Sequence, residues 1–226
     1  MPHVHHTLTS GAVVGVSSAG KPFSRRLVVL CQPFEFGGAF DPQPLTTNSF
    51  DLHIFVIDPV RPDAEVTTDE LAFTPEMHAN LILEYMQYVL HTARAVTGVD
   101  YGHIGVIGWG TGCKTAASLI EQGSTLIDRA ALVQPNMPLS EEILQAATAN
   151  HATGMRGRVQ RAIEERDSRT APALIDDATA AIHANPSSET FALPETLTID
   201  VSDATSPLHV LTSNWASILQ HVEQRA

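Results

Sequence analysis

The chain has 226 residues, of which 43% are hydrophobic and 17% are charged, and it contains 14 glycines and 14 prolines. This composition is typical of one compact α/β domain, and it excludes collagen, a coiled coil and gross disorder. The 13 basic and 25 acidic residues give a net charge of −12, so we expect no nucleic-acid partner.

Strand-like and helix-like segments alternate over the first 135 residues, which is the pattern of a parallel sheet with helical crossovers. Residues 11–17 predict an edge strand. The continuous apolar run at 26–31 predicts a central strand covered on both faces, and it leads into the glycine-containing loop 32–38. A second buried strand is predicted at 52–57, where Asp58 and Pro59 end it.

A helix start is predicted at Thr74, because a hydroxyl residue, a proline and an acid follow one another there. Apolar residues at helical spacing continue this helix to about Thr97, next to Gly98. The next elements form one strand–turn–helix–strand unit; in order they are residues 103–107, 108–112, 113–121 and 130–133.

The pattern changes after Pro135 to helical segments with no convincing strand. Because this stretch is too long for a plain connection, we expect residues 136–194 to form a helical cap inserted into a single domain that spans residues 1–226. A last strand is predicted at 196–201 and a terminal amphipathic helix at 211–224.

The sequence lacks features that would indicate a membrane location, secretion or a bound metal. No run approaches the ~20 apolar residues of a bilayer span, and the first residues do not resemble a signal peptide, so we expect a cytoplasmic protein without a membrane partner. Cys31 and Cys113 do not have the spacing of metal ligands. His3, His5 and His6 fit a disordered terminus better than a metal site, and we expect neither a metal nor a cofactor.

Two phosphate-binding motifs almost match the glycine turn. Residues 108–115 differ from the G-x-x-x-x-G-K-[ST] cradle at Cys113, where a glycine is needed for the backbone to wrap the phosphates. The dinucleotide motif G-x-G-x-x-G fails at the same residue, and the next strand ends at Gln134 instead of an acid. Both interpretations are therefore weak.

The segment 26–135 resembles the α/β-hydrolase superfamily. Residues 27–41 are similar to the segment that supplies one oxyanion-hole N–H in that family, and residues 103–112 are similar to the strand that enters the nucleophile elbow, G-x-S-x-G. The resemblance implies a mostly parallel sheet with helices on both faces and a helical cap over a cleft.

Gly110 occupies the position at which the family's elbow carries its nucleophile. A glycine adopts the strained elbow conformation without penalty but has no side chain to attack an acyl carbon. Thr111 would supply a backbone N–H to an oxyanion hole, and Trp109 would either line an apolar pocket or pack in the core. Cys113 lies in the first turn of the helix, where a buried packing role is the better interpretation.

The other two triad positions remain alternatives. In one register Asp203 follows the acid-bearing strand, and no later strand carries a histidine. In the other register residues 196–201 are the final strand, and His209 lies in the loop that presents the base; an exposed histidine at a helix start is the plainer interpretation. We expect His53 and His103 to be structural.

The sequence therefore predicts an α/β-hydrolase-like protein with little or no serine-esterase activity, which binds a small acyl or carboxylate ligand. The residues expected around that ligand are Gln32, Pro33, Phe34, Trp109 and Thr111. The alternative is an active esterase or thioesterase that uses a different nucleophile, or a water activated by Asp203 or His209. Homo-oligomers are left open.

Overall fold

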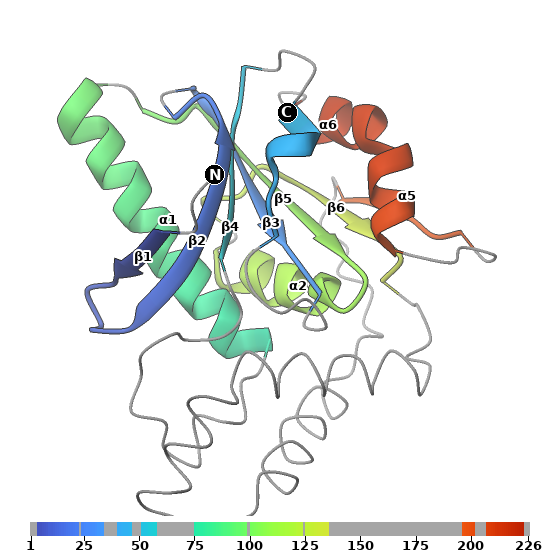
Figure 1. Cartoon of the computed structure of the whole chain (residues 1–226), viewed down its shortest axis with the longest axis horizontal. Coiled ribbons are helices and arrows are strands. Elements are labelled where there is room, and N and C mark those ends of the chain that lie inside the picture. The colour runs from blue at the N-terminus through green and yellow to red at the C-terminus, as the bar shows by residue number, and fades with distance from the viewer. Residues whose placement is uncertain are drawn as a thin grey trace, which may run out of the picture.

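The computed structural model describes residues 4–22, 24–33, 40–46, 51–57, 75–98, 100–123, 125–135, 196–201 and 207–223. The strands of these residues form one seven-stranded sheet with the order β1-β2-β4-β3-β5-β6-β7 (Figure 1). Strands β3 to β7 run parallel to one another, whereas β1 and β2 are antiparallel to their neighbours. The expected mostly parallel sheet is confirmed.

The central strands form where the sequence has continuous apolar runs. Their bounds are Arg26–Cys31 for β3, His53–Ile57 for β4, His103–Trp109 for β5 and Arg129–Val133 for β6. Every residue of β5 is buried, because helices cover both faces of the sheet at its centre. The predicted central position of residues 26–31 is confirmed, since β3 lies between β4 and β5.

The prediction for the start of the chain is wrong in two respects. Strand β2 (Val13–Gly20) lies between β1 and β4, so residues 11–17 do not form the edge of the sheet. The edge is β1 (Val4–Thr7), which includes His5 and His6 in a stretch that we expected to be disordered. Strand β1 forms because it pairs with β2 along its whole length, and this pairing compensates for its weak apolar character.

Helices lie on both faces of the sheet (Figure 1). Helices α1 (Pro75–Thr97) and α2 (Gly112–Gln122) pack on one face and share a core with Val29, Phe55 and Val106. Helices α5 (Pro207–Ser213) and α6 (Trp215–Glu223) pack on the other face over Ile107 and Val133. The short 3-10 helix η1 (Gln43–Thr46) joins this second face through Leu45.

The terminal helix that we predicted as one element is divided in two. Asn214 separates α5 from α6, and it donates both its backbone N–H and its Nδ2 to the Val210 carbonyl, at 3.1 and 2.9 Å. Such side-chain bonds to the backbone compete with the regular helix ladder. After the break, the Trp215 indole donates to the Leu45 carbonyl at 2.8 Å and fixes α6 against η1.

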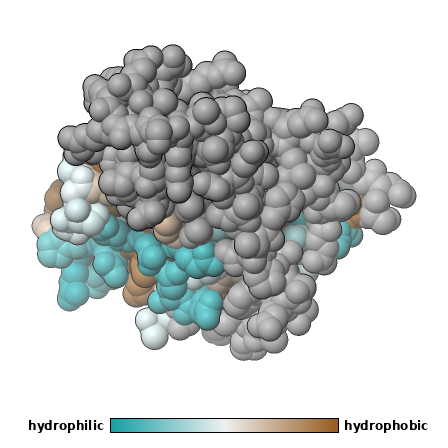
Figure 2. Space-filling view, turned by 90° about the horizontal axis from the view of Figure 1, so that it is seen from below, coloured by the Kyte–Doolittle hydropathy of each residue, from teal (hydrophilic) through white to brown (hydrophobic). Residues whose placement is uncertain are grey.

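The described surface carries few large hydrophobic side chains. Those that are exposed are Val4, Tyr88, Val96 and Val201. In the view from below, the described part of the surface mixes hydrophilic and hydrophobic residues (Figure 2). None of the described helices has both the length and the apolar character that crossing a membrane requires. The cap predicted at 136–194 lies outside the described residues, so it stays a prediction.

The first turn of α2 packs very closely on the carboxyl end of β3. A Cβ atom on Gly112 would lie 2.6 Å from both the carbonyl carbon and the carbonyl oxygen of Gln32, and closer still to the Cys31 carbonyl oxygen. A Cβ on Gly108 would lie 2.7 Å from the Ala116 Cβ and 2.9 Å from the Cys113 Cα. The backbone can therefore pass here only without side chains.

Substitution Gly112→Ala tests this packing. Alanine normally stabilises a helix more than glycine does. Here, however, its methyl group would meet main-chain atoms that cannot rotate away. We expect Gly112→Ala to lower the free energy of unfolding by about 2–3 kcal/mol in urea titrations. The control is Gly102→Ala, whose added Cβ meets no described atom within 4 Å, with an expected change of about 0.5 kcal/mol or less. Equal effects of the two substitutions would contradict the close packing.

Candidate functional site

The site is built on the turn between β5 and α2. Strand β5 ends at Trp109, Gly110 has a φ of 55°, and Thr111 is the cap residue from which α2 begins. This positive φ lies in the left-handed region that L-residues with a side chain rarely adopt. The Gly110 N–H donates to the Val133 carbonyl at 2.9 Å, and the Gly110 carbonyl accepts from Cys113 N at 3.1 Å. The predicted sharp strand–turn–helix geometry is present.

The end of β3 lies on one side of this turn. Gln32 and Pro33 follow β3 and are both buried, and no part of Gln32 is exposed. The Gln32 Oε1 accepts a hydrogen bond from the backbone N–H of Phe40 at 2.6 Å. The close packing of Gly112 on the Gln32 backbone places these residues directly beside the first turn of α2. Two of the predicted ligand residues are therefore next to the elbow.

The end of β6 lies on the other side of the turn. Val133 pairs with Trp109, and the next residue, Gln134, has a φ of 54° although it is not glycine. Gln134 is 3% exposed; its backbone N–H donates to the Ile199 carbonyl at 2.7 Å and its Nε2 donates to the Val201 carbonyl at 3.1 Å. No sequence pattern marks Gln134 as a site residue.

The Trp109 side chain is completely buried, within the core that α5 and α6 cover. Phe40 packs on it edge to face, with ring centroids 5.6 Å apart. The sequence left open whether this indole lines a ligand pocket or packs in the core, and this geometry favours core packing. An aromatic pair of this kind stabilises the segment that leads into the elbow.

Both cysteines are buried close to the turn. Burial is the main cause that raises the pKa of the Cys31 thiol and of the Cys113 thiol far above the ordinary value. The Cys113 thiol donates a hydrogen bond to the Val133 carbonyl at 3.4 Å. A thiol that stays protonated and points at a main-chain carbonyl is a packing residue, because the thiolate is the nucleophile of cysteine chemistry.

A buried histidine that no sequence motif indicated lies between α1 and α2. His78 is on the buried face of α1, its Nε2 donates to the Ile57 carbonyl at 3.2 Å, and its Nδ1 lies 3.5 Å from the Thr115 Oγ1. Burial lowers the pKa of His78 to about 4, so the ring is neutral at pH 7. The signal in the sequence is weak: a histidine that shares a helical stripe with Ala79, Ile82 and Met86.

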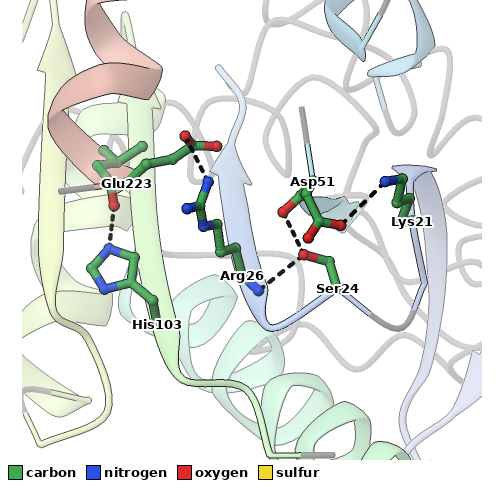
Figure 3. Close-up of polar contacts among 7 residues, drawn as sticks. Lys21, Ser24, Arg26, Asp51, His103 and Glu223 are labelled. Carbon is green, nitrogen blue, oxygen red and sulfur yellow. Dashed lines mark hydrogen bonds and ion pairs between the residues drawn. The ribbon is translucent and has the colours of Figure 1, made fainter. Parts of the chain in front are cut away.

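His103 lies at the other end of β5 from the turn. It is the first residue of β5, and the seven residues of this strand separate it from Gly110 by roughly 20 Å. Its Nε2 contacts the Val222 carbonyl (Figure 3). Its Nδ1 lies 3.3 Å from the Asp128 Oδ2. His53 bonds to the Tyr101 hydroxyl through Nδ1 at 3.0 Å. Both side chains bond within the protein, as we expected of structural histidines.

Further polar contacts lie at the same end of the sheet, near the amino ends of β3 and β4. Arg26 pairs with Glu223 at 3.1 Å, and the Ser24 hydroxyl donates to the Asp51 carbonyl at 2.5 Å (Figure 3). Lys21 lies 3.4 Å from the Asp51 carboxylate. These contacts tie the end of α6 and the start of β4 to the amino end of β3, so they serve the fold at a distance from the elbow.

The remaining predicted residues are only partly covered by the structure. Phe34 and Asp203 lie outside the described residues, so their roles stay predictions. His209 lies on α5 and is exposed. Within the described ranges, no group of three or more His, Cys, Asp and Glu side chains has the arrangement of a metal site.

The glycines and the threonine of the phosphate motif have other roles here. Gly108 and Gly112 are required by the packing of α2 on the sheet, and Gly110 by its positive φ. Thr115, where the motif places a magnesium ligand, is fully buried against His78. The geometry therefore explains each of these residues without a nucleotide.

The fold is that of the α/β hydrolases. No protein-family model matches the sequence, and no curated protein matches it. The chain is similar to a solved structure of a candidate acyltransferase from Salmonella enterica, at 12% identity and a TM-score of 0.56, over 97% of this chain and 95% of that one.

A second similar structure is that of E-2-(acetamidomethylene)succinate hydrolase, at 11% identity and a TM-score of 0.51, over 97% of this chain and 100% of that one. At identities this low, the likeness concerns the fold alone, and the chemistry of the site has to be argued from its own residues.

The neutral state of His78 predicts an acid-sensitive fold. Because the folded pKa of about 4 lies below the ordinary value near 6.5, the unfolded chain takes up the proton first, and stability falls as the pH decreases from about 6.5 to 4. We expect the free energy of unfolding, measured by urea titration at several pH values, to fall more steeply over this range in the wild type than in His78→Gln. His53, whose pKa burial also lowers to about 4, accounts for part of the remaining slope. Identical slopes would show that His78 is not buried in its neutral form.

Proposed function

We propose that this protein binds a small carboxylate or acyl compound at the β5–α2 turn and does not turn it over by a serine mechanism. The observation that carries the proposal is Gly110, which has a φ of 55° between a buried strand and a helix start. This conformation resembles the backbone of a nucleophile elbow, but the position offers no side-chain atom that could attack an acyl carbon.

Neighbouring side chains do not supply the missing nucleophile. Cys113 is the nearest thiol in sequence, and its buried, protonated state argues against thiolate chemistry. The Thr115 hydroxyl is buried against His78 and faces away from solvent. Neither the Cys113 thiol nor the Thr115 hydroxyl is therefore a good acceptor for a covalent acyl group.

The same turn retains features that favour an anion or a carbonyl oxygen. Helix α2 has 11 residues, and the amino end of such a helix carries a partial positive charge. Lys114 lies in its first turn and adds a half-exposed positive charge. The site also lies beyond the carboxyl ends of parallel strands, where open α/β sheets hold their ligands.

The alternative function is hydrolysis with an unusual nucleophile or an activated water, assisted by Asp203 or His209. The two functions differ in one measurable property, which is turnover of an activated ester by the purified wild-type protein.

Ester turnover gives the first test. We expect the wild type to release p-nitrophenol from acetyl, butyryl and octanoyl esters at the rate of the buffer alone, and to take no label from a fluorophosphonate probe. Gly110→Ser restores a hydroxyl at a cost of roughly 1–2 kcal/mol, because serine is strained at this φ. Labelling of this variant would show that a base is in place, and its absence would show that the base is missing too.

The result that would overturn the proposal is wild-type turnover well above the buffer rate that disappears in Cys113→Ala or His209→Ala. Gln122→Met, on the exposed end of α2, is the control for an unrelated substitution in the same region.

Ligand binding gives the second test. We expect butyrate to shift the backbone amide resonances of Gly110, Thr111 and Gly112 in a saturable manner, because its carboxylate binds at the amino end of α2. 1-Butanol has the same carbon chain without the charge and should leave these resonances in place. No shift with butyrate, or equal shifts throughout the sheet, would contradict a carboxylate site at the turn.

A further inference from the structure

Strand β1 forms one end of the sheet and has an exposed outer edge. Among the described strands it pairs only with β2, and three of its four residues, Val4, His5 and Thr7, are exposed. In an antiparallel pair only alternate residues bond to the neighbouring strand, so half of the β1 residues direct their N–H and C=O groups away from β2. Such groups are a template on which a further strand can pair.

The strand lacks the usual protections of an exposed edge. Monomeric proteins often place a lysine, a proline or a β-bulge in such a strand. The β1 sequence is Val-His-His-Thr, which contains neither of these residues. Its residues pair one to one with β2, from Val4 opposite Val16 to Thr7 opposite Val13, so no bulge twists the edge away. The edge is therefore open to pairing.

An exposed apolar surface lies beside this edge, where α1 passes β1 (Figure 1). The centroid of the His6 ring lies 5.3 Å from that of Tyr85 and 4.1 Å from that of Tyr88. Val4 is on the same face of β1 as His6, because side chains two residues apart in a strand share a face. Val4 is 57% exposed and Tyr88 is 41% exposed. We call Val4, His6, Tyr88 and the outer edge of β1 the edge patch.

The edge patch is nearly neutral, although the chain as a whole has a net charge of −12. Strand β1 has no acidic residue, lysine or arginine, and those of α1 are Glu76, Glu84 and Arg94. The Glu84 carboxylate accepts hydrogen bonds from Thr9 and Ser10 of its own chain. A second copy of the chain therefore meets less electrostatic repulsion here than the net charge would otherwise produce.

A second copy also matches the geometry of the edge patch. A two-fold axis perpendicular to the sheet sets β1 antiparallel to the β1 of the other copy, with outward N–H groups opposite C=O groups. The same axis leaves both α1 helices on one face of the joined sheet, so Val4 and Tyr88 of one copy approach those of the other. An unrelated strand would pair with the edge but would bring no matching apolar surface, so a second copy fits better.

We propose that two copies of this chain associate through the edge patch, with their β1 strands antiparallel, so that the two sheets become one continuous sheet. Because the paired strands are short, the buried area lies at the low end for a specific interface, and we expect a dissociation constant of roughly 10–100 µM. This association does not depend on the ligand proposed for the β5–α2 turn.

Sedimentation equilibrium of the full chain, without an added tag, tests the proposal at protein concentrations from about 5 to about 500 µM. We expect the wild type to change from monomer to dimer over this range. Val4→Lys should raise the dissociation constant at least about tenfold, because the two-fold axis brings two lysines together at the interface. Tyr88→Lys, at an exposed position of α1, should have the same effect and serves if Val4→Lys disturbs the pairing of β1 with β2.

The matched control is Val201→Lys, the same substitution at an exposed valine that follows β7 at the opposite end of the sheet. It should leave the dissociation constant unchanged. Amide hydrogen exchange gives a second measurement: the β1 amides should exchange more slowly in concentrated than in dilute wild-type protein, and the β7 amides should exchange at the same rate in both.

Three results would overturn the proposal. The first is a wild type that stays monomeric over the whole concentration range, which would leave the edge to a different partner or to none. The second is a dimer that neither Val4→Lys nor Tyr88→Lys weakens, because its interface would then lie elsewhere. The third is growth into larger assemblies without a stable dimer, because pairing through a two-fold axis uses up the edge of both copies.

Discussion

The close approach of α2 to the carboxyl end of β3 is the constraint on which the site depends. At Gly112 the helix backbone packs against the backbone of Gln32, and at Gly108 the strand packs against Ala116 of the helix. A side chain at either position would displace the helix. Gly110 completes the arrangement, because its positive φ reverses the chain within a single residue. The shape of the β5–α2 turn is therefore set by these close contacts and by the backbone of Gly110.

Most of the sheet could be predicted from the sequence, because its central strands and α1 depend on local apolar patterns. The runs at 26–31 and 52–57 have apolar side chains on both faces of the strand, so both faces have to be covered to remove them from water. The edge could not be predicted in the same way. Strand β1 has mostly exposed residues, and it exists through its pairing with β2. The break at Asn214 likewise depends on a side-chain bond that competes with the helix ladder.

The sequence predicted the backbone turn of the candidate site, but it did not predict all of the side chains around it. Three glycines within five residues indicated a tight turn at Gly110, and Gln32 and Pro33 followed from the end of a recognisable strand. His78 and Gln134 were missed because the properties that distinguish them are tertiary. A buried ring between two helices, or an amide oxygen without a partner, leaves no trace in spacing or composition.

The covering of the second face of the sheet has a consequence for how the chain assembles. Arg26 and Glu223 are 197 positions apart in sequence, and the Trp215–Leu45 bond joins residues 170 positions apart. Among the described residues, the cover that α5 and α6 give to β5 and β6 is therefore added only after residues 207–223 have been synthesised. Contacts of such long range slow folding, because the loop-closure entropy has to be lost before these contacts can form.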